Sequence, residues 1–270
     1  MTRERGGVAV GIASRHGEES NPLLKRCLES LRTVDAGMSF ALRLEVSPAL
    51  PRGEKRQRVF TWAEQRGYSH VVILEDDTTI VSAGWLRDLM ATAWSIDQVG
   101  MINPMETKDG FTPLQDALVH GKTAEMVTCF GFCILYSLAW RPHYDPRITY
   151  LDDVAMSLQC RAAGWRLVLC GTTMVQHTKE PFLRDDLPPW EQGDRARWGA
   201  TSSYYQKERH DQTRLHEAKI LIGEYGDMAL GVIPTEILQA IAEEQHVRVP
   251  PSGVEEKDTE GTLLQPGKLQ

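Results

Sequence analysis

The chain has 270 residues, 41% of them hydrophobic and 25% charged, which is enough to bury one large α/β core with a small appendage. Its formal net charge of −7 argues against broad, salt-dependent binding to nucleic acid. No run approaches ~20 apolar residues, and the short apolar segment near Met1 is unlike a secretory signal, so we expect no transmembrane segment and a cytoplasmic protein.

Strands and helices alternate along the N-terminal part of the chain. Short apolar runs predict strands, and apolar residues at i, i+3 and i+4 spacing, as from Leu23 to Leu31, predict helices. This alternation predicts a mostly parallel sheet with helices on both faces. The predicted strands cover 8–13, 40–46, 71–74 and 99–102, and the predicted helices begin at 21–22, 51–53 and 85.

The rest of the chain divides into shorter elements and breaker-rich segments. We predict a loop or hairpin over 106–122, a strand over 126–136, a helix over 152–163 and two short strands around Gly171, over 166–170 and 173–176. We then predict a mobile connection over 182–199, a helix over 204–222 stopped by Gly223, and a last helix over 236–245 capped by Thr235. The expected organisation is therefore an α/β domain over 1–180, a mobile loop with a helical appendage over 181–248, and a disordered tail over 249–270.

Three consecutive acids, Glu75, Asp76 and Asp77, follow the third predicted strand. Ligands of open parallel sheets bind outside the carboxyl ends of the strands. Adjacent carboxylates repel one another unless a cation lies between them, and divalent cations prefer oxygen ligands. The pattern indicates either a metal site or an acidic loop that caps the next helix.

Two further features carry candidate chemistry. Asp152 and Asp153 begin an amphipathic helix, where an aspartate can cap the helix or act as a general base. His177 ends the strand predicted over 173–176. A lone histidine is usually structural, but imidazole also binds manganese-like metals when carboxylates supply the other ligands.

Several short motifs join these acids in a fixed order. They are Cys27-Leu28-Glu29-Ser30-Leu31, Gly84-Trp85-Leu86, Phe130-Gly131-Phe132-Cys133, Tyr144-Asp145-Pro146-Arg147, Arg161-Ala162-Ala163-Gly164-Trp165 and Val175-Gln176-His177. The acids at 75–77 and those at 152–153 are called the two acidic stations below. Together with them, these motifs resemble the family 2 glycosyltransferases over about residues 7–180. The resemblance implies a GT-A fold, with a Rossmann-like, mostly parallel sheet flanked by helices, and here a helical C-terminal appendage.

The resemblance also implies a chemistry, which is the inverting transfer of a sugar from a nucleotide-sugar donor to an acceptor hydroxyl. Asp153 would take the proton from the acceptor, and Asp152 would hold the acceptor or support the base. Mn²⁺ or Mg²⁺ would bind to Glu75, Asp77 and His177. The residues expected on the donor side are Ser14, Glu45, Arg58 and Asp76. Outside the resemblance, Arg195 and Arg197 either reach the diphosphate when the 182–199 loop closes or belong to a plain solvated connection.

The sequence departs from the family pattern on the nucleotide side. Ala13-Ser14-Arg15-His16 replaces the usual turn after the first strand, Glu45 substitutes for an aspartate, and Val59 follows Arg58 where an asparagine is common. The donor nucleotide, the acceptor (a glycan, a lipid-linked sugar, a metabolite, a protein or a modified nucleic-acid base) and the oligomeric state therefore stay open. Two alternatives are a sugar-1-phosphate nucleotidyltransferase and a catalytically inactive nucleotide-sugar or glycan-binding module.

Overall fold

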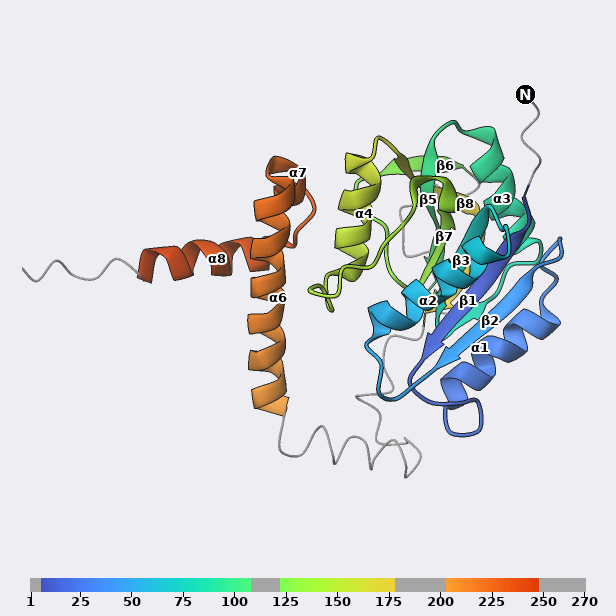
Figure 1. The fold of residues 1–270 in the computed structure, drawn as a ribbon, viewed down its shortest axis with the longest axis horizontal. Coiled ribbons are helices and arrows are strands. Elements are labelled where there is room, and N and C mark those ends of the chain that lie inside the picture. Colours follow the sequence, from blue (N-terminus) through green and yellow to red (C-terminus); the bar gives the residue numbers. More distant parts are fainter. Residues whose placement is uncertain (1–5, 108–121, 178–202, 248–270) are drawn as a thin grey trace, which may run out of the picture.

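The computed structural model describes residues 6–107, 122–177 and 203–247, without the side chains of 203–210 and 244–247 (Figure 1). The strands are β1 (Val8–Ser14), β2 (Ala41–Val46), β3 (His70–Glu75), β4 (Thr78–Ile80), β5 (Val99–Thr107), β6 (Thr123–Met126), β7 (Cys133–Ser137) and β8 (Arg166–His177). The helices are α1 (Pro22–Thr33), α2 (Arg52–Gln65), α3 (Trp85–Ser95), α4 (Asp152–Ala162), α6 (Ser203–Tyr225), α7 (Asp227–Leu230) and α8 (Thr235–Val247). No helix among these residues has the length and apolarity needed to cross a membrane.

The strands form one sheet in the order β2-β1-β3-β7-β5-β8-β4, with β6 also paired to β8. β1 is parallel to β2 and β3, and β5 is parallel to β8, whereas β7 runs antiparallel between β3 and β5. The short strands β4 and β6 run antiparallel to β8. The predicted mostly parallel α/β sheet flanked by helices is confirmed.

The alternation of side chains along the central strands creates two apolar layers. Val10 and Val72 face the layer that α1 and α3 cover, whereas Ala9 and Val71 face the layer that α2 and α4 cover. Gly11 of β1 lets α2 approach closely, because a Cβ at this position would lie 2.2 Å from a methyl carbon of Val59. The amino end of α2 is thereby held against the carboxyl ends of β1 and β3, where the acids lie.

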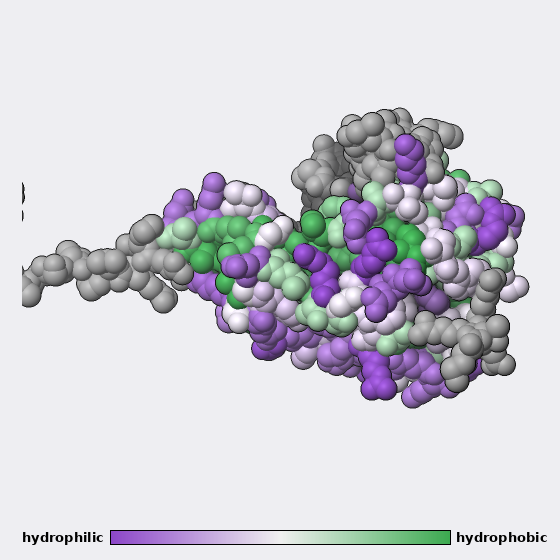
Figure 2. All heavy atoms as spheres, turned by 90° about the horizontal axis from the view of Figure 1, so that it is seen from above, coloured by the Kyte–Doolittle hydropathy of each residue, from purple (hydrophilic) through white to green (hydrophobic). Residues whose placement is uncertain are grey.

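A third apolar cluster joins the C-terminal helices to α4. It contains Ile148, Leu151, Val154, Ala155 and Leu158 on one side, and Ala218, Leu221, Ala229, Ile233, Ile237 and Ile241 on the other. In Figure 1, α6 lies beside α4 and α8 extends away from the sheet. Figure 2 shows hydrophobic surface along the same appendage, where Leu230 is 46% exposed. The appendage therefore buries one apolar side against α4 and leaves other apolar side chains at the surface.

Three local predictions were wrong for identifiable reasons. The strand predicted over 126–136 is interrupted from 127 to 132, because the backbone of Phe130 is bound by the buried Asn103 side chain instead of a neighbouring strand. The two strands expected around Gly171 are one strand, β8, whose register against β5 shifts opposite Pro104. Helix α6 passes through Gly223 and ends before Gly226, which has a φ of 52°. The segments predicted over 182–199 and from 249 onward, and most of 106–122, lie outside the described residues.

Candidate active site

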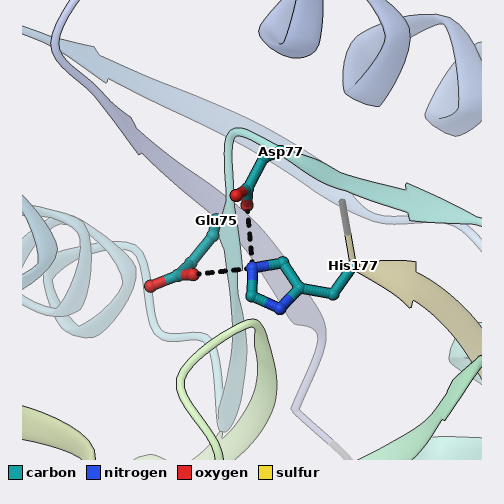
Figure 3. Close-up of side chains that lie close together, drawn as sticks. All are labelled: Glu75, Asp77 and His177. Carbon is teal, nitrogen blue, oxygen red and sulfur yellow. Dashed lines mark ion pairs between the residues drawn. The ribbon is translucent and has the colours of Figure 1, made fainter. Parts of the chain in front are cut away.

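Three side chains converge at the carboxyl edge of the sheet. Glu75 ends β3, Asp77 precedes β4 and His177 ends β8. The strand β4 brings Asp77 to His177, because Thr78 lies directly opposite His177 in the β4–β8 ladder. His177 Nε2 lies 3.3 Å from Glu75 Oε2 and 3.2 Å from Asp77 Oδ1, so both contacts end at one ring nitrogen (Figure 3).

The chemistry of this cluster suits a divalent cation. The three ligand atoms lie within 4.8 Å of one another, and Asp77 Oδ1 is buried without a hydrogen-bond partner among the described residues. A single Nε2–H can point at only one carboxylate, whereas one cation can bind all three groups. Burial lowers the pKa of His177, but Asp77 and Glu75 outweigh burial and raise it to about 9. The cluster thus already attracts positive charge.

Two further side chains flank the imidazole of His177. The ring of Phe132 stacks on it at a centroid distance of 5.5 Å. The carboxylate oxygen Oε1 of Glu106, on β5, lies 3.6 Å from Nδ1, the nitrogen that faces away from the other two acids. Carboxylates beside the second ring nitrogen commonly orient histidines that bind metals.

Two arginines from the first turns of α2 join this cluster to the acids of α4. The buried Arg56 donates to Glu75 Oε1 at 2.7 Å and to Asp152 Oδ2 at 2.6 Å. Arg52 donates to Glu75 Oε1 at 3.1 Å and to Asp152 Oδ1 at 2.8 Å. Burial alone would raise the pKa of Glu75, but His177 and both arginines hold it far below its ordinary value. The two acidic stations are therefore parts of one charged network.

The sequence-based prediction did not include these two arginines and named Arg58 as a donor-side residue instead. Positions 52 and 56 are four residues apart and share one helix face, whereas position 58 lies about 200° around the helix from position 56. Arg58 accordingly points outward and pairs with the exposed Glu54 at 3.0 Å. The spacing of Arg52 and Arg56 at the start of a helix that follows a strand was the available signal.

Asp152 and Asp153 are adjacent, but their surroundings differ. Both carboxylate oxygens of Asp152 are bound by the arginines of α2. Asp153 Oδ1 accepts only its neighbour's N–H, from Val154 at 2.8 Å, and Oδ2 accepts no hydrogen bond from the described residues. Burial and the charge of Asp152 raise the pKa of Asp153 to about 6. Asp153 therefore has both an open oxygen and a basicity suited to accepting a proton near neutral pH.

Gly131 lies between the base candidate and the metal-site candidate. A Cβ at this position would lie 3.5 Å from Glu75 Oε1 and 3.8 Å from Asp153 Cβ. The absence of a side chain leaves room between these two acids, and Phe130, next to Gly131, is 44% exposed. Gly131 is therefore a point of the backbone that adjoins both stations.

The remaining predicted donor-side residues lie at the carboxyl ends of three neighbouring strands, with Ser14 ending β1, Glu45 near the end of β2 and Asp76 directly after β3. Asp76 Oδ2 accepts hydrogen bonds from Ser14 Oγ at 2.6 Å and from Asn21 Nδ2 at 2.9 Å, and burial raises the pKa of Asp76. The buried Lys55, which was not predicted, donates to the carbonyls of Ser14 and Ser47 and ties the two strand ends together. Glu45 is buried near the end of β2 and pairs with Arg43. Arg195 and Arg197 lie outside the described residues.

The sequence itself matches no family model and no curated protein. The structure resembles S. aureus TarS, residues 1–349, with a TM-score of 0.51 and 12% identity over 89% of this chain and 87% of that chain. The same protein in complex with UDP-GlcNAc gives 0.51 and 12% over 87% and 83%. GalNAc-T7, solved with UDP, GalNAc and Mn²⁺, gives 0.49 and 12% over 65% of this chain and only 44% of that chain.

These similarities bear on the fold. The chain has the GT-A fold, and the resemblance to family 2 glycosyltransferases that the motifs indicate is confirmed at that level. At 12% identity, fold similarity does not assign an activity, because one fold hosts many functions. The activity has to be argued from the site.

Proposed function

We propose that this protein is a metal-dependent, inverting glycosyltransferase that moves a sugar from a nucleotide-sugar donor to an acceptor hydroxyl. One observation carries the proposal: Gly131 adjoins both Asp153, whose Oδ2 accepts no hydrogen bond from the described residues, and Glu75, which belongs to the cluster with Asp77 and His177. This proximity, at the carboxyl edge of a GT-A sheet, supports a pairing of a proton acceptor with a group that would bind the donor diphosphate.

Glu75, Asp77 and His177 would hold the cation, with Glu106 orienting the imidazole. When bound, Mn²⁺ or Mg²⁺ supplies positive charge that stabilises the leaving nucleoside diphosphate. The arginines of α2 keep Glu75 ionised and fix its position, so this proposed ligand is already charged and oriented before a cation binds.

Asp153 is the general base of the proposed reaction. Its open oxygen accepts the proton of the acceptor hydroxyl, whose oxygen then attacks the anomeric carbon from the face opposite the leaving diphosphate. A single displacement of this kind inverts the anomeric configuration. Asp152 is less suited to act as the general base, since arginines bind both of its carboxylate oxygens. It instead holds the beginning of α4 in place.

The donor's nucleoside would lie over the ends of β1 and β2. Asp76 keeps one oxygen engaged by Ser14 and Asn21, which fixes its carboxylate for a hydroxyl of the ribose or of the donor sugar. Arg195 and Arg197 remain proposed contacts of the diphosphate.

The direct test is donor binding and turnover by the full chain across UDP-, GDP-, dTDP- and CMP-sugars, with Mn²⁺, Mg²⁺ or EDTA. UDP-GlcNAc comes first in this panel because TarS binds it. A donor at 100 times its Kd stabilises the protein by about 2.7 kcal/mol, which a thermal shift detects easily. We expect one donor class to stabilise the protein only with metal, and the same mixture to release nucleoside diphosphate slowly to water.

Two matched variants sharpen this test. Asp77→Asn should abolish the metal-dependent shift, whereas Asp145→Asn, at a partly exposed acid paired with Arg147, should keep it.

If no donor binds under any metal condition, the proposal is wrong. Donor binding without turnover for any acceptor class would instead favour a binding module, and pyrophosphate release from a nucleoside triphosphate and a sugar 1-phosphate would favour a nucleotidyltransferase.

A further inference from the structure

Helix α6 of the C-terminal appendage places one acid, Glu217, against the segment that precedes α4. Glu217 is fully buried, with 0% exposure. Its Oε1 accepts the backbone N–H of Thr149 at 2.7 Å, and its Oε2 accepts those of Tyr150 at 3.0 Å and Leu151 at 2.9 Å. A buried carboxylate is costly unless it is well hydrogen-bonded, and here three charge-assisted bonds compensate it.

The three N–H groups belong to residues 149–151, the segment that leads into the amino end of α4. The N-cap residue of α4 is Leu151, whose side chain has no acceptor. Helix amino ends carry unsatisfied donors and a partial positive charge, which an anionic side chain satisfies. Within α4, Asp152 Oδ1 and Asp153 Oδ1 accept the N–H groups of Asp153 and Val154. Glu217 supplies, from a helix far along the chain, the anion that accepts the three N–H groups just before the helix.

The segment held by Glu217 leads directly into the site. Asp152 and Asp153 follow Leu151 without an intervening residue. The carbonyl of Thr149 also accepts a hydrogen bond from Arg52 at 3.3 Å, and Arg52 is one of the two arginines that bridge the acidic stations. The backbone of residues 149–151 is therefore fixed on one side by the appendage and on the other by the charged network.

We propose that Glu217 is a positioning residue through which the C-terminal appendage sets the active site: it fixes residues 149–151 so that Asp153 presents its open oxygen to the acceptor. The proposal rests on the proposed function for the role of Asp153. It gives the appendage a purpose beyond packing, because the apolar contacts between α6 and α4 bring the two helices together but do not by themselves fix a backbone segment.

The test compares two glutamates of the same helix. Glu217→Gln keeps the side chain's size but places an amide NH₂ where an acceptor stood, so at least one backbone N–H loses its partner. Glu224→Gln is the matched control, because Glu224 lies on α6 and pairs with the exposed Arg147. Hydrogen exchange of the amides of residues 149–151 should be faster in Glu217→Gln than in the wild type, and unchanged in Glu224→Gln.

Donor turnover supplies the second measurement. A misplacement of ~1 Å can cost about 100-fold in rate, so kcat for donor hydrolysis with Mn²⁺ should fall by roughly 10- to 100-fold in Glu217→Gln. KM for the donor should stay unchanged, since the proposed metal ligands belong to the sheet. Glu224→Gln should match the wild type in both constants.

Leu221→Ala separates positioning from general loosening of the appendage. Leu221 is buried on α6 within the cluster shared with α4, but it makes none of the three hydrogen bonds. We expect this variant to lose at least as much thermal stability as Glu217→Gln and yet keep its kcat. Equal loss of kcat in both variants, or unchanged amide exchange in Glu217→Gln, would overturn the proposal. If the wild type binds and turns over no donor, the proposed function fails, and the exchange measurement alone decides whether Glu217 holds the segment.

Discussion

Replacing Asp153 with asparagine should stabilise the protein while removing its activity. Asparagine keeps the shape and the bond from Val154, but it carries no charge. Because burial and Asp152 raise the pKa of Asp153 from an ordinary 3.8 to about 6, the ionised carboxylate is disfavoured in the folded state. About two pKa units at ~1.4 kcal/mol each give about 3 kcal/mol, and partial solvation reduces the expected gain to roughly 1–3 kcal/mol at pH 8.

The sign of this effect is the same at every pH, but its size depends on pH. Below about pH 4, Asp153 is protonated in the folded and the unfolded chain, so the charge contributes no penalty. Between about pH 4 and 6 the unfolded chain loses the proton first, and the folded state is progressively destabilised relative to it. Above about pH 6 the penalty is complete and constant. The advantage of Asp153→Asn should therefore grow from pH 4 to 6 and then level off.

Urea unfolding of the metal-free protein at pH 4.5 and pH 8 measures this difference. Asp145→Asn is the control of opposite sign, because a hydrogen bond from Arg147 lowers the pKa of Asp145, and its loss should destabilise the protein at pH 8. Wild-type donor turnover should rise with pH through about 6, as the base deprotonates, and should be lost in Asp153→Asn although the donor still binds. The buried-charge reasoning is refuted if Asp153→Asn is less stable than the wild type at pH 8, or if its gain in free energy of unfolding over the wild type is the same at both pH values. Turnover comparable to that of the wild type would remove Asp153 from the mechanism.

Three further variants probe the rest of the network, and a fourth is a control outside it. Glu106→Gln, which acts only on the orientation of the ring, should weaken Mn²⁺ binding, measured by calorimetry, by about 10- to 100-fold, and His177→Ala should weaken it further because it removes a proposed ligand. Arg56→Gln should cost about 3–5 kcal/mol in urea unfolding because it leaves two acids without their buried partner. Arg58→Gln on the same helix should change stability by no more than about 0.5 kcal/mol, and a larger loss would show that the outward-facing position had been misjudged.

The fold could be predicted from the sequence because its signals are local. Alternating apolar runs and periodic helices specify a parallel α/β sheet without knowledge of any distant contact. The acid stations were equally local, since Glu75 and Asp77 follow a buried strand and the acids of α4 begin a helix. What joins Asp77 to His177 was not local, because the joining strand β4 is only three residues long and is defined by its partner.

The elements that the sequence did not predict depend on side chains that bind distant backbone. Asn103 holds the carbonyl and N–H of Phe130 and thereby ends a strand that the apolar pattern continues. Glu217 binds three N–H groups more than sixty residues away along the chain. Such bonds leave no periodicity, because the same residue types occur on any polar surface. They become visible only when burial shows that these side chains cannot be solvated.

The two aspartates at the start of α4 show how the network assigns separate roles to identical residues. Asp152 is neutralised by two guanidinium groups, whereas Asp153 keeps an open oxygen and a pKa of about 6. Neighbouring acids whose surroundings push their proton affinities apart are a common mark of acid–base sites. The same arginines also bind a proposed metal ligand, Glu75, so the two acidic stations share two guanidinium groups before any cation binds. A divalent cation on the sheet side offsets the remaining charge, and we therefore expect metal binding and the acceptor side to be coupled, with Arg56 as the residue through which each station affects the other.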